Sequence, residues 1–147
     1  MSAAETLARP DRAALLDVAR ASIRHGLRHG HALTVAPEDH PASLRPPRAT
    51  FVTLEIGGQL RGCIGTLLAH QPLVADVAAH AYAAAFEDPR FPGLTSAEYP
   101  RLEVHISVLS PPESLQFDAE DDLIARLRPG VDGLILQFRG HRATFLP

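Results

Sequence analysis

Residues 50–65 read TFVTLEIGGQLRGCIG and predict a β-hairpin, with strands over 50–56 and 60–67 joined at a pair of glycines. The second strand holds the only cysteine of the chain, Cys63, between two further glycines in the motif LRGCIG. A glycine costs a strand about 0.5–1 kcal/mol relative to alanine. Two of them beside a thiol therefore indicate that another backbone or a ligand approaches this strand closely.

The alternation of polar and apolar residues sets the register of this hairpin. A two-residue turn would place a charged residue opposite an apolar one at two positions, so we expect a three-residue loop over 57–59. The apolar face then pairs Val52 with Ile64, Leu54 with Gly62 and Ile56 with Leu60, and the polar face pairs Thr53 with Cys63 and Glu55 with Arg61. Because Cys63 falls on the polar face, we expect its thiol to point away from the core.

The composition predicts one globular domain over residues 1–147. Hydrophobic residues make up 46% and charged residues 21% of the chain, and no apolar run is long enough to span a bilayer. The first five residues lack the basic and apolar pattern of an export signal, and one cysteine cannot form an internal disulfide. We therefore expect a cytoplasmic protein.

The charged residues argue against several classes of function. The chain contains 14 arginines and no lysine. This argues against Schiff-base chemistry and a P-loop, since both require a lysine amine. The net charge of −3 and the lack of a basic strip argue against a nucleic-acid partner. The eight histidines include His25, His29 and His31 but show no metal-motif spacing, so we expect neither a metal site nor a cofactor.

Helical and strand periodicities alternate along the rest of the chain. Asp11 is the expected N-cap of the first helix, and the second helix carries a polar stripe of Asp76, His80 and Glu87. The expected elements are helices over 12–28, 72–86 and 118–127, a strand over 102–109, and a second hairpin of strands 133–138 and 141–146. Hairpins interleaved with helices, without regular βαβ crossovers, predict an α+β fold: a mainly antiparallel sheet of about five strands, built from hairpins and flanked by about three helices.

Cys63 is the candidate nucleophile of this chain. The candidate bases are His80 and His105, which periodicity assigns to polar faces, and Glu87 or Asp88 is the candidate group that orients the base. A structural thiol is the alternative, because unpaired cysteine is among the most buried residue types.

Two arginines are candidate ligands for an anion. Arg61 lies two residues from the thiol, where a guanidinium favours the nucleophilic thiolate, and Arg90 follows in the turn after the second helix. Together they could hold a carboxylate or phosphate; the alternative for Arg90 is to brace its turn against a neighbouring carboxylate. The predicted ligand-contacting set is Arg61, Gly62, Gly65, Glu87, Asp88 and Arg90.

Several runs of residues, spread over nearly the whole chain, match one family. They include FVTL (51–54), LRGCIG (60–65), AAAFEDPRF (83–91), ISVL (106–109), DGL (132–134) and TFLP (144–147). With these runs the chain resembles the AMME chromosomal region domain family, the protein A component of the AmmeMemoRadiSam system. The combination of LRGCIG with DPRF (88–91) is specific to that family.

The resemblance implies an α+β fold with a cleft near the cysteine motif, but no settled biochemical activity. Such domains are associated in prokaryotes with a Memo-like protein and a radical S-adenosylmethionine enzyme, which are the implied partners. Family members usually continue past TFLP, so we expect this chain to lack a C-terminal segment. We expect the Cys63 site to bind a small anionic ligand or a modified side chain; the alternative is a non-catalytic adaptor, with a partner docked beside the strand.

Overall fold

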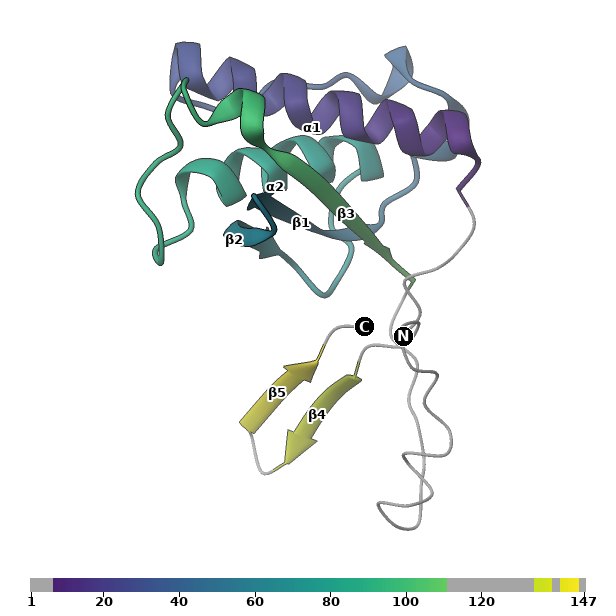
Figure 1. Cartoon of the computed structure of the whole chain (residues 1–147). Helices are drawn as coiled ribbons and strands as arrows, with labels where there is room; N and C mark the ends of the chain where they lie inside the picture. The colour runs from purple at the N-terminus through teal and green to yellow at the C-terminus, as the bar shows by residue number, and fades with distance from the viewer. Residues whose placement is uncertain (1–6, 111–133, 139–140, 146–147) are drawn as a thin grey trace.

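The computed structural model describes residues 7–110, 134–138 and 141–145. These residues form two α-helices and five strands, with three short 3-10 turns between them. In chain order they are α1 (Arg9–His29), turns Pro37–Asp39 and Ala42–Leu44, β1 (Ala49–Ile56), β2 (Gln59–Gly65), α2 (Leu73–Phe86), turn Tyr99–Arg101, β3 (Glu103–Leu109), β4 (Leu134–Phe138) and β5 (His141–Phe145) (Figure 1).

The strands form two separate antiparallel sheets. One has three strands in the order β2-β1-β3, and the other is the hairpin β4-β5, which confirms the second predicted hairpin. The predicted α+β class and antiparallel pairing are confirmed, but the described residues hold three strands in the main sheet and two helices, fewer than the expected five strands and three helices. Hairpin partners are adjacent in sequence, whereas the grouping of hairpins into sheets depends on distant contacts that periodicity does not report. The predicted helix over 118–127 lies outside the described residues.

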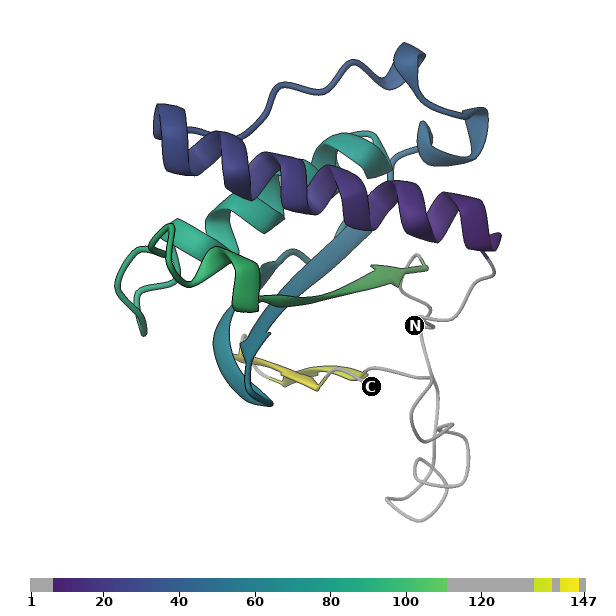
Figure 2. The same ribbon diagram turned by 45° about the horizontal axis from the view of Figure 1, so that its top comes forward.

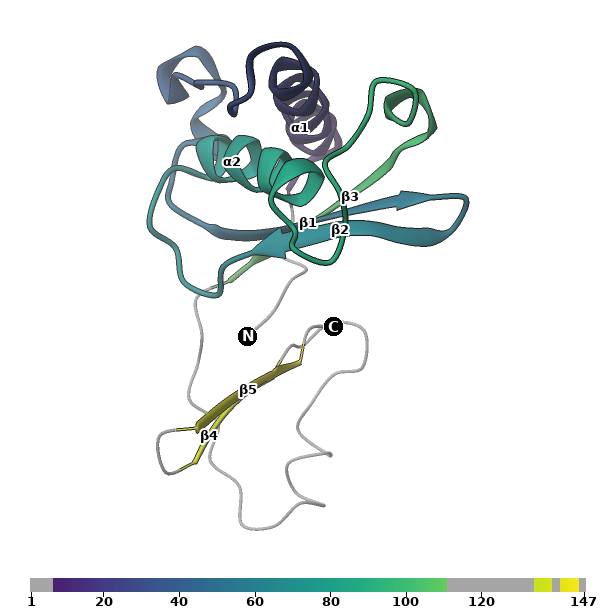
Figure 3. The same cartoon turned by 90° about the vertical axis from the view of Figure 1, so that its left-hand side faces the viewer.

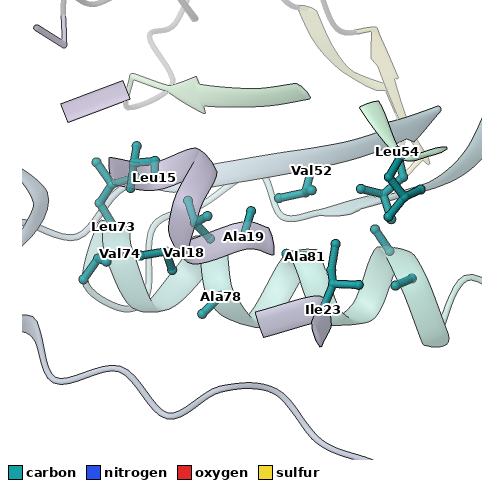
Figure 4. Packing of buried hydrophobic residues seen from close by; sticks show 14 of the residues in the cluster. Leu15, Val18, Ala19, Ile23, Val52, Leu54, Leu73, Val74, Ala78 and Ala81 are labelled. Atoms are coloured by element: carbon teal, nitrogen blue, oxygen red, sulfur yellow. The ribbon is translucent and has the colours of Figure 1, made fainter. Parts of the chain in front are cut away.

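Both helices cover the same face of the three-stranded sheet (Figure 3). Helix α2 packs on β1 and β2, while α1 packs on α2 and reaches β3. The apolar stripe of α1 recurs every fourth residue and meets an alanine-rich face of α2. The core shown in Figure 4 contains Leu15, Val18, Ala19 and Ile23 from α1, Val52 and Leu54 from β1, and Leu73, Val74, Ala78 and Ala81 from α2.

The first helix begins earlier than its sequence suggests. Its N-cap is Ala8, and Pro10 lies in its first turn, so the prediction of Asp11 as the N-cap is wrong. Proline tolerates this position because its missing N–H would have no partner there. Asp11 instead accepts a hydrogen bond from Ser43 Oγ at 2.6 Å, which ties α1 to the loop over residues 30–48. That loop returns along the helix side to the start of β1 (Figure 2).

Two glycines permit close packing of these layers. A Cβ on Gly62 of β2 would overlap the carbonyl oxygen of Ala84 in α2. A Cβ on Gly26 of α1 would overlap the rings of Tyr82 and Phe86. Neither α1 nor α2 has the length and hydropathy of a membrane-spanning helix.

Candidate functional site

The β1–β2 register places Cys63 on the face of the sheet opposite the helices. The structure confirms the predicted pairs Thr53 with Cys63, Leu54 with Gly62 and Val52 with Ile64. Val52 and Leu54 are fully buried beneath the helices, whereas Cys63 is half-buried. Because neighbouring residues of a strand point to opposite faces, the thiol lies away from the core, as predicted.

The register differs from the prediction near the turn. Gly57 and Gly58 form a two-residue turn with φ values of 57° and 78°, a backbone conformation that suits glycine. A β-bulge between Leu54 and Glu55 shifts the register of the two strands. Glu55 therefore faces Leu60 instead of Arg61, while Leu54 and the residues before it have the predicted partners. The expected three-residue loop and the Glu55–Arg61 pair are therefore wrong. The bulge absorbs the extra residue that the loop was expected to hold.

Asp88 ties the turn after α2 to the backbone of Cys63. Its side chain is 2% exposed, and its Oδ2 atom accepts a hydrogen bond from the Cys63 amide at 3.0 Å. The Cys63 thiol itself lies 3.2 Å from the Thr53 hydroxyl. Residues 25 positions apart in sequence thus meet at the thiol-bearing strand.

Arg90 completes this turn by binding Asp88 at two points. The Nε atom donates to Oδ1 at 3.0 Å and Nη2 donates to Oδ2 at 2.7 Å. Arg90 and the Cys63 amide outweigh burial and hold the pKa of Asp88 well below its usual range, while Asp88 raises the pKa of Arg90. Arg90 therefore braces its turn, the alternative that the sequence left open, yet its side chain remains 55% exposed.

Arg61 is buried and bound to Glu98, a residue that the sequence analysis missed. Its Nε and Nη2 atoms donate to the two Glu98 carboxylate oxygens at 2.8 and 3.1 Å, and Nη2 also reaches the Pro92 carbonyl at 2.8 Å. Arg61 lowers the pKa of Glu98 to about 2. The ring of Phe91 lies between 5 and 6 Å from both guanidinium groups, at 5.8 Å from Arg61 and 5.5 Å from Arg90.

Glu98 had a recognisable signal in the sequence. Thr95 and Glu98 are three residues apart, the spacing of a capping box. In the structure the Thr95 amide donates to Glu98 Oε1 at 3.0 Å, and the Glu98 amide donates to Thr95 Oγ1 at 3.3 Å. This local box could be inferred from the sequence, but its pairing with Arg61 could not.

Other atoms of the protein occupy the space beside both glycines of the LRGCIG motif. The space beside Gly62 holds the Ala84 carbonyl, and a Cβ on Gly65 would overlap the Thr50 carbonyl oxygen and the Phe51 ring. Of the two explanations expected for these glycines, close approach of another backbone accounts for Gly62. Glu87, also predicted to contact a ligand, is exposed at the end of α2, where its amide donates to the Ala83 carbonyl.

His80 lies on the wrong side of the sheet to act on Cys63. It is 7% exposed, in contrast to the predicted solvent-facing stripe of α2, and Asp76 is fully buried beside it. Thr50 Oγ1 donates to Asp76 Oδ2 at 2.7 Å, and His80 Nδ1 lies 3.1 Å from the same oxygen. Burial raises the pKa of Asp76, but hydrogen bonds from His80, Thr50 and Gln71 outweigh it and lower the pKa overall. Asp76 and His80 of α2 can be buried because their polar atoms have hydrogen-bond partners within this cluster.

His105 shares the face of Cys63 but binds carboxylates. It pairs with Thr53 across β1 and β3, so Thr53 lies between the cysteine and the histidine in one row across the sheet. His105 Nε2 is 2.9 Å from Glu55 Oε1 and 3.9 Å from Glu103 Oε2. Among the described residues, neither candidate histidine is hydrogen-bonded to the thiol. The potential metal ligands of Glu55, Glu103 and His105 all lie within 4.8 Å of one another.

Comparison with known proteins places these motifs in a family. A family model for AMMECR1 matches residues 16–147, which include the Cys63 strand and the Asp88 turn. The chain belongs to the AMMECR1 family. This confirms the resemblance found in the sequence.

Archaeal proteins of the AMMECR1 family are similar over most of this chain. A protein from Methanothermobacter thermautotrophicus is 40% identical over 96% of the chain and 73% of its own length, and Protein MJ0810 from Methanocaldococcus jannaschii is 34% identical over 75% and 56%. The crystal structure of the uncharacterized protein PH0010 from Pyrococcus horikoshii matches with a TM-score of 0.79 and 33% identity, over 90% of this chain and 66% of that one. The chain thus spans about two thirds of the PH0010 chain and just over half of MJ0810.

Proposed function

We propose that this AMMECR1 domain binds a small anionic ligand or a modified side chain beside Cys63, with the thiol and the Arg90 guanidinium in contact with it. The observation that carries this proposal is the shared oxygen Asp88 Oδ2, which accepts hydrogen bonds from both the Cys63 amide and Arg90 Nη2. One buried carboxylate therefore holds a half-buried thiol residue and an exposed cation side by side.

Arg90 is better suited than Arg61 to receive an anion. Its bonds to Asp88 use Nε and Nη2, and a guanidinium carries five N–H donors, so donors remain on a side chain that is 55% exposed. Arg61 is 10% exposed and already binds both oxygens of Glu98. The two-arginine clamp expected from the sequence is therefore reduced to a single arginine beside the thiol.

The proposed partners are a Memo-like protein and a radical S-adenosylmethionine enzyme. This part of the proposal rests on the family to which the chain belongs. A ligand held against the Cys63 thiol would lie on the sheet face opposite α1 and α2, on the side away from the core.

Charge-selective alkylation of Cys63 tests the binding site directly. Iodoacetate is an anion and iodoacetamide is neutral, so the ratio of their rates reports electrostatic attraction to the only thiol of the chain. We expect this ratio to be several-fold higher than for a cysteine in an unstructured peptide, and to fall to the peptide value in Arg90→Gln. Added phosphate or acetate should slow both reagents.

The matched control is Arg24→Gln, because Arg24 is an exposed arginine on α1, on the other side of the sheet. It should leave the rate ratio unchanged. A ratio in the native chain equal to that of the peptide, or an equal effect of both substitutions, would contradict an anion site at Arg90.

A non-catalytic adaptor is the second candidate function, because β2 is an edge strand of the three-stranded sheet. A partner strand would need the outward-pointing amides of β2, and Asp88 already occupies that of Cys63. Binding of the Memo-like protein that survives both Cys63→Ser and Arg90→Gln without change would favour the adaptor. Loss of binding in Arg90→Gln would favour the ligand site.

A further inference from the structure

Three histidine rings gather at the C-terminal end of α1, away from the Cys63 site. His25 and His29 are four residues apart on the helix, and His31 follows the helix-ending Gly30, whose φ of 75° turns the chain back. The ring centroids are 4.5 Å apart for His25–His29, 4.8 Å for His25–His31 and 6.2 Å for His29–His31. Residues separated by the end of the helix thus form one cluster of imidazoles.

The hydrogen bonding of two rings in this cluster, His31 and His25, is compatible with binding of a metal ion. His31 Nδ1 lies 3.0 Å from the Ala32 carbonyl oxygen, which can only accept, so Nδ1 is the donor of this bond and Nε2 is the ring nitrogen left for a ligand. A bond from the second ring nitrogen to a backbone carbonyl is the usual support of a metal-bound histidine. His25 Nε2 is buried and has no hydrogen-bond partner. A buried ring nitrogen of this kind requires a partner, and coordination to a metal ion would give it one.

The spacing of the rings is close to that around a tetrahedral ion. With metal–nitrogen bonds of about 2.0–2.1 Å, the centres of two bound imidazoles lie about 5 Å apart. In this conformation the ring nitrogens of the three residues do not all fall within 4.8 Å of one another, so binding requires the rings to turn. His29 is exposed, so its ring can turn in solvent while His31 keeps its bond to Ala32.

We propose that His25, His29 and His31 form a binding site for one divalent ion that favours imidazole ligands, with Zn²⁺ as the leading candidate. Three nitrogen ligands leave the fourth tetrahedral position to water. The sequence alone predicted no metal site because the spacing matches no metal motif; the turn at Gly30 brings the third histidine to the other two.

Zinc titration of the full, tag-free chain tests this site. We expect isothermal titration calorimetry with zinc chloride to give one ion per chain, and Co²⁺ to give the strong visible absorption of a tetrahedral complex. The substitutions His29→Gln and His31→Gln change exposed residues and should leave the fold intact. Each should weaken binding at least about tenfold, since loss of even a supporting partner of a ligand costs about 10–100-fold.

The control is His105→Gln, which removes the histidine of the Glu55–Glu103–His105 group. It should leave zinc affinity unchanged. The proposal is overturned if the native chain binds no zinc, if His29→Gln and His31→Gln bind as tightly as the native chain, or if His105→Gln alone abolishes binding.

Discussion

Replacing Gly62 by alanine should destabilise the fold by separating α2 from β2. The added Cβ would overlap the Ala84 carbonyl oxygen and lie 3.0 Å from the Ala84 carbonyl carbon. Both atoms belong to the helix backbone, so no side-chain rotation relieves the overlap, and α2 itself must move. The buried residues on both sides of this contact, such as Leu54 and Ala81, would then lose packing.

The size of the effect follows from two opposing contributions. Overpacking a core costs about 1–3 kcal/mol, and the upper end applies because the obstacle is backbone. Alanine returns about 0.4–1 kcal/mol by restricting the unfolded chain. The expected net loss in the free energy of unfolding is about 2 kcal/mol, which corresponds to a Tm lower by about 4–8 °C for a domain of this size.

Urea denaturation followed by far-ultraviolet circular dichroism measures this loss, since the chain has no tryptophan. The matched control is Gly93→Ala, whose Cβ would lie 3.8 Å from Phe86 Cδ1, an ordinary contact. Gly93→Ala should be as stable as the native chain or slightly more stable. The reasoning fails if Gly62→Ala unfolds at the native urea midpoint, or if both substitutions cost the same.

Three further predictions concern the buried and charged groups. Asp76→Ala should lower the free energy of unfolding by about 3 kcal/mol or more in urea titrations, because it leaves Thr50 and His80 without their buried acceptor; a loss below about 1 kcal/mol would contradict this. Glu98 has a folded pKa of about 2 against 4.5 for the free side chain, so its stabilising contribution is present above about pH 4.5 and is lost as the pH falls towards 2; Glu98→Gln should flatten that part of the stability–pH profile, and an unchanged slope would refute the assignment. Cys63→Ser should shift the Tm by less than about 3 °C, since the thiol is half-buried on the face away from the core, whereas a larger drop would identify a structural cysteine.

Local pattern predicted the parts of this fold that depend on alternation along one strand. Thr53 faces Cys63 as expected because polar and apolar residues alternate on both strands. Alternation does not predict the turn, because a β-bulge changes the register without changing the polar and apolar pattern of the strands. Because of the bulge at Glu55, the hairpin has a two-residue turn, but its strands beyond the bulge pair in the register expected for a three-residue loop.

Tertiary contacts decided the features that periodicity misassigned. Asp76 and His80 lie on a helical stripe that would be solvated on an isolated helix, but β1 places Thr50 against it and makes it a buried polar cluster. Arg61 was expected to pair within its hairpin and instead binds Glu98, 37 residues away. A single sequence contains no signal for such distant pairs.

The buried Asp76–Thr50 contact determines more than local stability. The core-facing residues of α2 are mainly alanine and valine, so hydrocarbon contacts alone distinguish poorly between positions of the helix along its axis. A slide by one turn, about 5.4 Å, would break the hydrogen bond to Thr50 and carry Asp88 away from the β2 amide that it holds. The interior carboxylate thus acts as an axial reference point for the whole helix. Replacing Asp76 would therefore change the surroundings of the Cys63 sulfur atom by letting α2 move, although Asp76 lies on the opposite face of the sheet from the sulfur.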